Sequence, residues 1–293
     1  MAARAGSFEP AGFEGRRVTL RTTTDRQLLR AFLERDRLYA AYALCNLEER
    51  EFGRTRWSVA FNGEAPLAVA MEYAGPAPQP LFLLGDATAT GTLLRDLVRP
   101  RHAYLDVLRE ALPAVEDHYR LEPGPPMVRM WVDRTTFRPY PAEVHRLGPG
   151  EVGDLNRLYE LGFTAWLPSQ AIGEGVYYGL RVNGRLVAAA GTHVISTAAR
   201  LAAVGNVMTA EPYRGRGYAK ATTTAVTEEL LRYCDQAVLN VRSDNSSALA
   251  AYAAIGYREH VRFEQRVAHR RGSPWDGIME PLRRLIGEPR QET

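Results

Sequence analysis

The sequence predicts an α/β fold in which two mixed-sheet domains follow one another along the chain. After residue 142, strands and helices are expected in the order β-α-β-β-β-α-β-α-β. Two Asn-Gly pairs, Asn62–Gly63 and Asn183–Gly184, each separate two apolar runs and predict one hairpin in each half. A loop rich in glycine and arginine, EPYRGRGYAK at residues 211–220, joins a predicted strand to a predicted helix.

Composition and charge narrow the class of protein. The chain has 293 residues, of which 45% are hydrophobic and 24% charged, as in an ordinary globular protein. No apolar run approaches the ~20 residues that span a bilayer, and residues 1–15 lack the apolar segment of a signal peptide, so we expect a cytoplasmic protein without a membrane partner. The net charge of +3 is scattered, which argues against nucleic acid and suits a small polyanionic ligand. The two cysteines, Cys45 and Cys234, have neither metal-site nor disulfide spacing, so no metal is expected.

Breaks rich in proline and glycine divide the chain. The region from Arg138–Pro141 to Gly148–Gly150 is the expected domain boundary. The predicted division is therefore a first domain at 1–140, a second domain at 141–272 and a tail at 273–293. Residues Ile278–Ile286 of the tail are expected to form a short helix that docks within the chain or across a dimer, which leaves a monomer and a homodimer both open.

The elements of the second half follow from apolar periodicity. Alternation of period two predicts strands at Val144–Leu147, Val176–Arg181, Leu186–His193, Leu201–Thr209, Ala237–Val241 and Tyr257–Val267. Helical spacing predicts helices at Glu151–Leu161, Tyr218–Tyr233 and Ser246–Ile255, the last of which ends at Gly256.

The first half shows a fainter version of the same pattern. Its expected elements are strands at Trp57–Phe61, Leu67–Tyr73, Leu81–Leu84 and Met127–Val132 and a helix at Ala103–Tyr119. A shift of about 120 positions overlays its hairpin and the next strand on those of the second half, which indicates a divergent internal duplication. The alternative is two unrelated α/β domains that share a hairpin.

The loop at 211–220 has the properties of an anion site. Gly215 and Gly217 allow backbone N–H groups to approach a ligand, and the helix that begins near Tyr218 adds unpaired N–H groups and the positive end of its dipole. Two arginines and a lysine supply formal charge, and together these features predict a pyrophosphate site. The spacing fits neither a Walker loop nor a dinucleotide fingerprint.

Two motifs carry a resemblance to a known family. The pattern R-x-x-G-x-A at 214–219 resembles the pyrophosphate loop of the GNAT superfamily of acyl-CoA-dependent N-acyltransferases. The stretch LNVRSDNSSALAAYAAIGY is similar to a second element of that superfamily, N-x-x-A-x-x-x-Y-x-x-x-G-[FY], at Asn245, Ala248, Tyr252, Gly256 and Tyr257. The resemblance covers about residues 142–267. The first half lacks these motifs, so it resembles the degenerate half of glycine N-acyltransferase relatives and is expected to have lost cofactor binding.

The resemblance implies a reaction and a set of site residues. It implies transfer of an acyl group from acetyl-CoA, or another acyl-CoA, to a primary amine of a small molecule or a peptide. It implies that backbone groups of the strand end and the loop hold the co-substrate, and that Tyr252 protonates the leaving thiolate. The implied co-substrate contacts are Val207, Met208, Thr209, Arg214, Gly215, Arg216, Gly217, Tyr218, Ala219, Lys220, Asn240, Asn245 and Tyr252.

One position departs from the family. Many relatives that acetylate amines carry a glutamate base five positions before the helix asparagine, where this chain has Asn240. The base is therefore open between a neutral amine, a water chain, His193, Glu174 and a residue of the first half. Trp166, Glu174 and His193 are the candidate substrate contacts. Trp166 suggests an apolar or aromatic acceptor, or else it is a packed loop residue. The alternative function is a non-catalytic acyl-CoA sensor.

Overall fold

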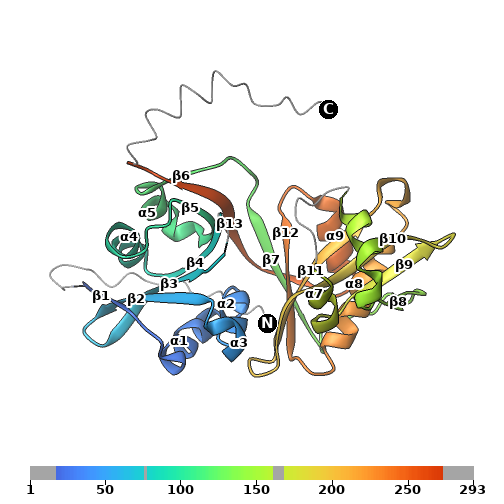
Figure 1. Ribbon diagram of the computed structural model, residues 1–293, viewed down its shortest axis with the longest axis horizontal. Coiled ribbons are helices and arrows are strands. Elements are labelled where there is room, and N and C mark those ends of the chain that lie inside the picture. Colours follow the sequence, from blue (N-terminus) through green and yellow to red (C-terminus); the bar gives the residue numbers. More distant parts are fainter. Residues whose placement is uncertain (1–17, 76–77, 161–167, 273–293) are drawn as a thin grey trace, which may run out of the picture.

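The computed structural model describes residues 18–75, 78–160 and 168–272, and within them thirteen strands form one mixed sheet (Figure 1). The tail helix expected at 278–286 lies outside these residues. The predicted fold class, two mixed-sheet halves in tandem, is confirmed. The first half contributes β1 (Val18–Thr22), β2 (Thr55–Asn62), β3 (Ala65–Tyr73), β4 (Gln79–Gly85), β5 (His102–Leu108), β6 (Tyr119–Leu121) and β7 (Met127–Asp133). Its helices are α1 (Arg26–Leu33), α2 (Ala41–Cys45), α3 (Glu49–Phe52), α4 (Ala87–Asp96) and α5 (Leu112–Glu116).

The second half repeats this plan. Its strands are β8 (His145–Arg146), β9 (Tyr178–Val182), β10 (Arg185–Ser196), β11 (Leu201–Thr209), β12 (Gln236–Arg242) and β13 (Arg258–Arg270). Its helices are α6 (Val152–Tyr159), α7 (Ser169–Glu174), α8 (Tyr218–Leu230) and α9 (Ser246–Ala254). The expected strand at 201–209 has the predicted bounds, whereas the strand expected at 144–147 shortens to two residues.

The order of strands in the sheet reads the same from both ends. It runs β1-β2-β3-β4-β5-β13-β7-β12-β11-β10-β9-β8, so each first-half strand on this path has a counterpart at the matching place in the second half; β6 lies off the path and pairs with β13. The pairs β4–β5 and β11–β12 are parallel, and all the other strand pairs in the described residues are antiparallel. This pseudo-twofold arrangement supports an internal duplication.

The two halves exchange their last strands. β7 comes from the first half, but it pairs along its length with β12 of the second. β13 ends the second half, but it pairs with β5 of the first, and the two exchanged strands pair with each other at the centre of the sheet. Figure 1 shows β7 and β13 between the two halves. The domain boundary at 140/141 remains a proposal. It divides the sequence, but in the sheet β7 and β13 each pair with a strand from the other side of that boundary.

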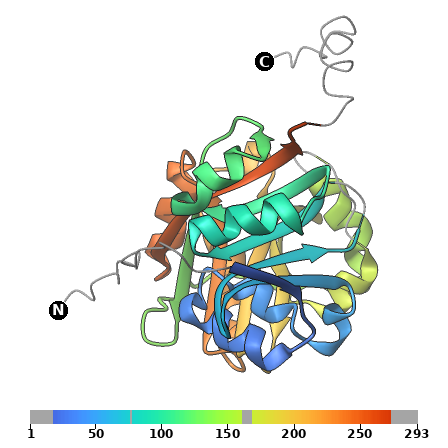
Figure 2. The ribbon, with the colours of Figure 1, turned by 90° about the vertical axis from the view of Figure 1, so that its left-hand side faces the viewer.

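One predicted element of the first half is wrong. The stretch expected as a helix at Ala103–Tyr119 begins with strand β5, in which Ala103, Leu105 and Val107 are buried in alternation. That alternation has the period of a strand, not of a helix. The helix that follows β4 is α4, which is capped by Asp86 and lies across the strands of the first half, as the view from that side shows (Figure 2).

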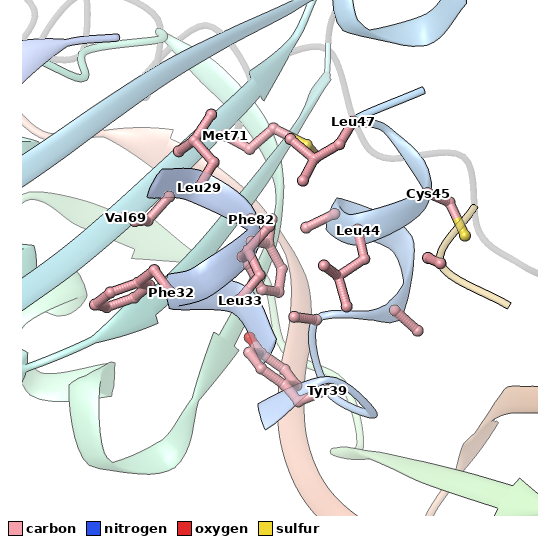
Figure 3. Packing of buried hydrophobic residues seen from close by; sticks show 14 of the residues in the cluster. Leu29, Phe32, Leu33, Tyr39, Leu44, Cys45, Leu47, Val69, Met71 and Phe82 are labelled. Carbon is pink, nitrogen blue, oxygen red and sulfur yellow. The ribbon is translucent and has the colours of Figure 1, made fainter. Parts of the chain in front are cut away.

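Helices cover both faces of the sheet where the second half lies. On one face, α1 and α2 of the first half pack with Ala203 of β11 and Val238 of β12 in a continuous cluster, part of which Figure 3 shows. On the other face, α8 and α9 pack with Val204 and Leu239 of the same strands. The first half therefore supplies one of the two layers that enclose β11 and β12.

Candidate functional site

The strands β11 and β12 separate at mid-sheet. Their parallel register runs from Leu201 opposite Gln236 to Val204 opposite Leu239 and then ends. Beyond that point β11 pairs only with β10, and β12 pairs only with β7, among the described strands. The backbone of Val207, Met208 and Thr209 thus lies along a strand edge that no described strand pairs on the β12 side.

A β-bulge lies at the start of this gap. Met208 pairs with Ala189 and Gly205 with Gly191, so Asn206 and Val207 together face one residue of β10. Asn206 adopts a φ of +52°, a left-handed conformation that asparagine tolerates better than most residues. The carbonyl of Asn206 accepts a hydrogen bond of 2.8 Å from the Tyr159 hydroxyl, which holds the bulge. The bulge turns the edge of β11 away from β12.

The loop after β11, where the sequence predicts an anion site, has a backbone geometry that suits one. A short 3-10 helix, η4 (Glu211–Tyr213), leads into Gly215 and Gly217, which have φ values of +75° and +81°. Gly217 precedes α8, and no described side chain caps that helix, so the N–H groups of its first turn remain available to a ligand. Arg214 and Arg216 are exposed beside these groups. The loop therefore offers backbone donors, a helix dipole and cations together.

Tyr140 is a contact of this loop that the sequence did not reveal. A Cβ at Gly217 would lie 3.0 Å from the Tyr140 hydroxyl. The ammonium of Lys220 lies 4.5 Å from the centre of the Tyr140 ring, and the Tyr140 N–H donates to Thr224 of α8 at 3.3 Å. The proline-rich break between the halves thus runs along α8 and encloses a cavity of about 320 Å³ against it. The proline-rich RPYP stretch was predicted only as a boundary.

Tyr252 lies on the α8–α9 side of the sheet. It is 8% exposed in the cluster that contains Val204 and Leu239, and burial raises its pKa to about 12. The phenol therefore keeps its proton throughout the neutral range and can act as a donor. Asn245 caps α9, since its side-chain oxygen accepts from the Ala248 N–H at 3.1 Å, so the motif asparagine has a structural role.

Asn240 lies on the opposite side of the sheet and is held by Arg129. Its side-chain oxygen accepts from the Arg129 Nε at 2.6 Å, and the same guanidinium donates to the backbone carbonyls of Leu38 and Tyr39 at 2.9 and 3.0 Å. Arg129 is 1% exposed. An amide cannot take a proton from an amine, and this one is already bonded. A lone arginine in the apolar run MVRMWVD was the signal for this contact.

His193 lies over the start of the gap on the same side as Asn240. It occupies an irregularity of β10 between Thr192 and Val194, and a Cβ at Gly205 would come within 2.2 Å of its Nε2. Its Nδ1 is 2.8 Å from the hydroxyl of Tyr42, and its Nε2 is 3.2 Å from the side-chain oxygen of Asn206. Burial lowers the pKa of His193 below its usual value, which favours the neutral ring.

The remaining substrate candidates lie elsewhere. Glu174 ends α7, where its carboxylate pairs with Arg50 of α3 at 2.7 Å and accepts from Gln170 at 2.9 Å. Both charges of the Arg50 pair are largely exposed, so the pair stabilises the contact between the halves only weakly. Trp166 lies outside the described residues. The described residues thus place His193 and Asn240 on one side of the sheet, where β11 and β12 separate, and Tyr252 on the other.

The matching place in the first half does not offer an anion site. The chain passes from Gly85 to Asp86 and directly into α4, and the Asp86 carboxylate accepts from the Ala89 N–H at 2.8 Å. The Asp86 carboxylate thus caps the start of α4, whereas no described side chain caps the start of α8 in the second half. The carboxylate would repel a phosphate. The Tyr39 hydroxyl donates to the Leu83 carbonyl at 3.1 Å, which occupies the end of β4.

Known proteins resemble the chain in family and fold. Residues 144–257 match the model of the acetyltransferase (GNAT) family. A GCN5-related N-acetyltransferase from Sphaerobacter thermophilus is 17% identical, covering 87% of this chain and 95% of its own at a TM-score of 0.59. A Drosophila protein is 12% identical, covering 86% and 98% at a TM-score of 0.65. A tandem GNAT protein from the clavulanic acid biosynthesis pathway is 14% identical, covering 88% and 99% at a TM-score of 0.53. No curated protein matches the chain.

Two further properties of the described residues bear on the site. None of their helices is both long and apolar enough to cross a membrane. They hold no group of three or more histidine, cysteine, aspartate or glutamate side chains that would bind a metal ion. The family match, the separated strands and the glycine loop agree with one another: residues 144–257 match the acetyltransferase (GNAT) family model, and the chain has the fold of tandem GNAT proteins.

Proposed function

We propose that the chain is an acyl-CoA-dependent N-acyltransferase that moves an acetyl group from acetyl-CoA to a primary amine of a small molecule or a peptide. One observation carries the proposal: the open edge of β11 leads directly into a glycine loop and an uncapped helix start. A ligand with a thioester on a slender arm and a diphosphate at its other end matches this arrangement. The arm would lie along the β11 edge, and the diphosphate would lie at the glycine loop and helix start.

The chain's own residues suit binding of that co-substrate. Backbone N–H groups between Gly215 and Lys220 would hold the diphosphate, with Arg214 and Arg216 at its exposed side. Backbone groups of Val207, Met208 and Thr209 would bond the arm as a neighbouring strand does. The side-chain oxygen of Thr209 is buried and has no hydrogen-bond partner among the described residues, so it could bond a polar group of the ligand.

The proposed chemistry divides between the two faces of the sheet. Acetyl-CoA, when bound, supplies a thioester whose carbonyl an amine attacks. The β11 edge would orient and polarise that carbonyl, and Tyr252, which is protonated at neutral pH, would give its proton to the leaving sulfur. The amine would approach from the face that carries Asn240 and His193.

The second candidate is a sensor that binds acyl-CoA without turnover. Asn240 favours it, because the amide is bonded to Arg129 and no carboxylate stands at the position of the family's base. Both candidates bind acyl-CoA, but only the transferase turns it over.

A paired experiment tests the proposal. Calorimetry with acetyl-CoA and free coenzyme A on the full chain should show binding of both. Incubation with acetyl-CoA and a panel of amines should then release free thiol in proportion to acetylated product. Binding without thiol release for any amine would favour the sensor, and absence of binding would refute both candidates.

A further inference from the structure

Tyr42 reaches the candidate active site from the half that lacks the family motifs. It lies on α2, which packs on β10 and β11 of the second half. Its neighbours on the helix are buried, but its own side chain is only partly covered. Its hydroxyl lies 2.8 Å from Nδ1 of His193, and the two rings are 6.0 Å apart. The first half therefore supplies a polar group at the start of the gap.

The Thr192 carbonyl fixes which atoms donate and which accept in the hydrogen bonds around His193. The Thr192 carbonyl can only accept, so the Tyr177 hydroxyl donates to it at 3.0 Å. Tyr177 then accepts from the side-chain N–H of Asn206 at 3.0 Å, which leaves the Asn206 oxygen facing His193. Nε2 of His193 must therefore carry the proton and donate. Nδ1 is left with a lone pair, which accepts from the hydroxyl of Tyr42.

Tyr42 is the last donor in this series of hydrogen bonds. The lone pairs of its hydroxyl oxygen can therefore accept a proton. We propose that the Tyr42 oxygen takes a proton from the incoming ammonium group while passing its own proton to Nδ1 of His193. The inference rests on the proposed function. It assigns the role of general base, which the Asn240 amide cannot fill, to Tyr42 and His193. Tyr42 is then a catalytic residue, His193 is the proton acceptor, and Asn206 is a positioning residue that fixes the ring.

The step balances in atoms and charge. The ammonium loses one proton to Tyr42, His193 becomes an imidazolium, and that proton then passes to the water that reaches the exposed part of this residue. The neutral amine bonds to the acetyl carbon as the carbon–sulfur bond breaks, and the sulfur takes the proton of Tyr252. The newly acetylated nitrogen still carries one proton too many. It loses that proton to water, and water returns a proton to the Tyr252 phenolate.

The surroundings suit this transfer. Burial raises the pKa of Tyr42 well above its usual value, so the hydroxyl keeps a proton to pass on. Burial lowers the pKa of His193, so the ring is neutral and ready to accept. The charged and titratable groups that face Tyr42 are Arg129 of β7, Asp106 and Tyr104 of β5, and Cys45 of α2 itself. Those beyond Asn206 are Tyr177 and Tyr159.

Kinetics across pH test the relay. Tyr42→Phe and His193→Gln should each lower kcat/KM for the amine by about 100-fold at pH 7, and the double variant should lose no more than either single one. The loss should shrink as the pH approaches the amine's own pKa, where no base is needed. Affinity for acetyl-CoA should stay within a few-fold. Tyr39→Phe is the matched control, because it removes a buried hydroxyl of the same region that bonds only Leu83, and it should keep the wild-type pH profile.

A second measurement does not depend on turnover. Nitrogen-15 spectra of the full chain at neutral pH, assigned with His193→Gln among the six histidines, should show His193 with its proton on Nε2. A proton on Nδ1 would overturn the relay, and so would a Tyr42→Phe enzyme with the wild-type pH profile. A wild-type chain that binds acetyl-CoA but turns over no amine would overturn the relay together with the proposed transferase.

Discussion

Arg129 lies in the middle of β7, where its guanidinium is buried and joins the two halves. It donates to Asn240 of the second half and to the carbonyls of Leu38 and Tyr39 of the first. In the first half, Asp106 of β5 lies opposite Gln265 of the exchanged strand β13, as Asn240 of β12 lies opposite Arg129 of the exchanged strand β7.

Tyr252 is the residue expected to act as the acid. Tyr252→Phe should lower kcat by about 100-fold and leave acetyl-CoA affinity within a few-fold, because only proton donation to sulfur is removed. Steady-state kinetics and calorimetry measure the two effects. Tyr257→Phe is the matched control: its hydroxyl bonds Thr227 at 2.8 Å, so its loss should cost about 1 kcal/mol of stability and little turnover. Parallel loss of affinity in Tyr252→Phe would make Tyr252 a binding or core residue.

Asp106 gives the fold a pH dependence of known sign. Burial raises its pKa to about 6, against lowering by the Arg129 charge and the Gln265 hydrogen bond. A raised carboxyl pKa means that the folded chain binds the proton more tightly than the unfolded chain, so stability falls as pH rises from about 4 to about 7. In urea unfolding, Asp106→Asn should therefore be more favourable relative to wild type at pH 8 than at pH 4. An equal difference at both pH values would refute the assignment.

At the scale of elements, the glycine loop and α8 work as a unit with the open edge of β11. The register of β11 against β10 ends in a bulge, and the register against β12 ends at Val204. The same strand, loop and helix occur in the first half, but there a capping aspartate takes the place of the loop. The difference between an anion site and a plain turn is thus a matter of a few residues at one helix start.

Gly217→Glu should abolish acetyl-CoA binding in calorimetry. The new side chain adds a negative charge at the helix start, and a Cβ there meets the Tyr140 hydroxyl at 3.0 Å. The left-handed φ of +81° also costs roughly 1–2 kcal/mol for a non-glycine residue. Gly184→Glu is the control: its φ is +78° and a Cβ meets nothing within 4 Å, so it pays the same backbone cost away from the loop. Retained binding in Gly217→Glu would contradict the anion site.

At the scale of the whole molecule, the exchange of β7 and β13 makes the halves depend on each other. Each exchanged strand completes the sheet of the other half over seven residue pairs. The first half also packs α2 against β11 and β12 of the second half. We therefore expect the second half to need the first, which closes its sheet and covers one of its faces.

Splitting the chain between residues 142 and 143 tests this dependence. Each fragment alone should fail to unfold cooperatively, because its outer strand edge and apolar face are exposed. Co-expressed, the fragments should associate and recover the circular dichroism and acetyl-CoA binding of the intact chain. A fragment 143–293 that unfolds cooperatively on its own at the temperature of the intact chain would show that the exchange is not required.

The sequence alone determined the features that depend on local spacing. Asn-Gly turns, the glycine loop and the run from Asn245 to Tyr257 predicted the hairpins, the anion site and the family resemblance, because turns, helix starts and helix faces are set by neighbours in the chain. The helix expected at 103–119 shows the limit, since tertiary burial on alternate residues makes it a strand.

Only the tertiary structure decided which half completes which site. Tyr42 and His193 are 151 positions apart, and Arg129 and Asn240 are 111 apart, so no spacing rule connects them. Their meeting depends on how the duplicated sheets join, which is settled by long-range strand pairing and by burial of the apolar faces. Local spacing in the sequence thus predicted the glycine loop, whereas the packing of the first half against the second brought Tyr42 to His193 and Arg129 to Asn240.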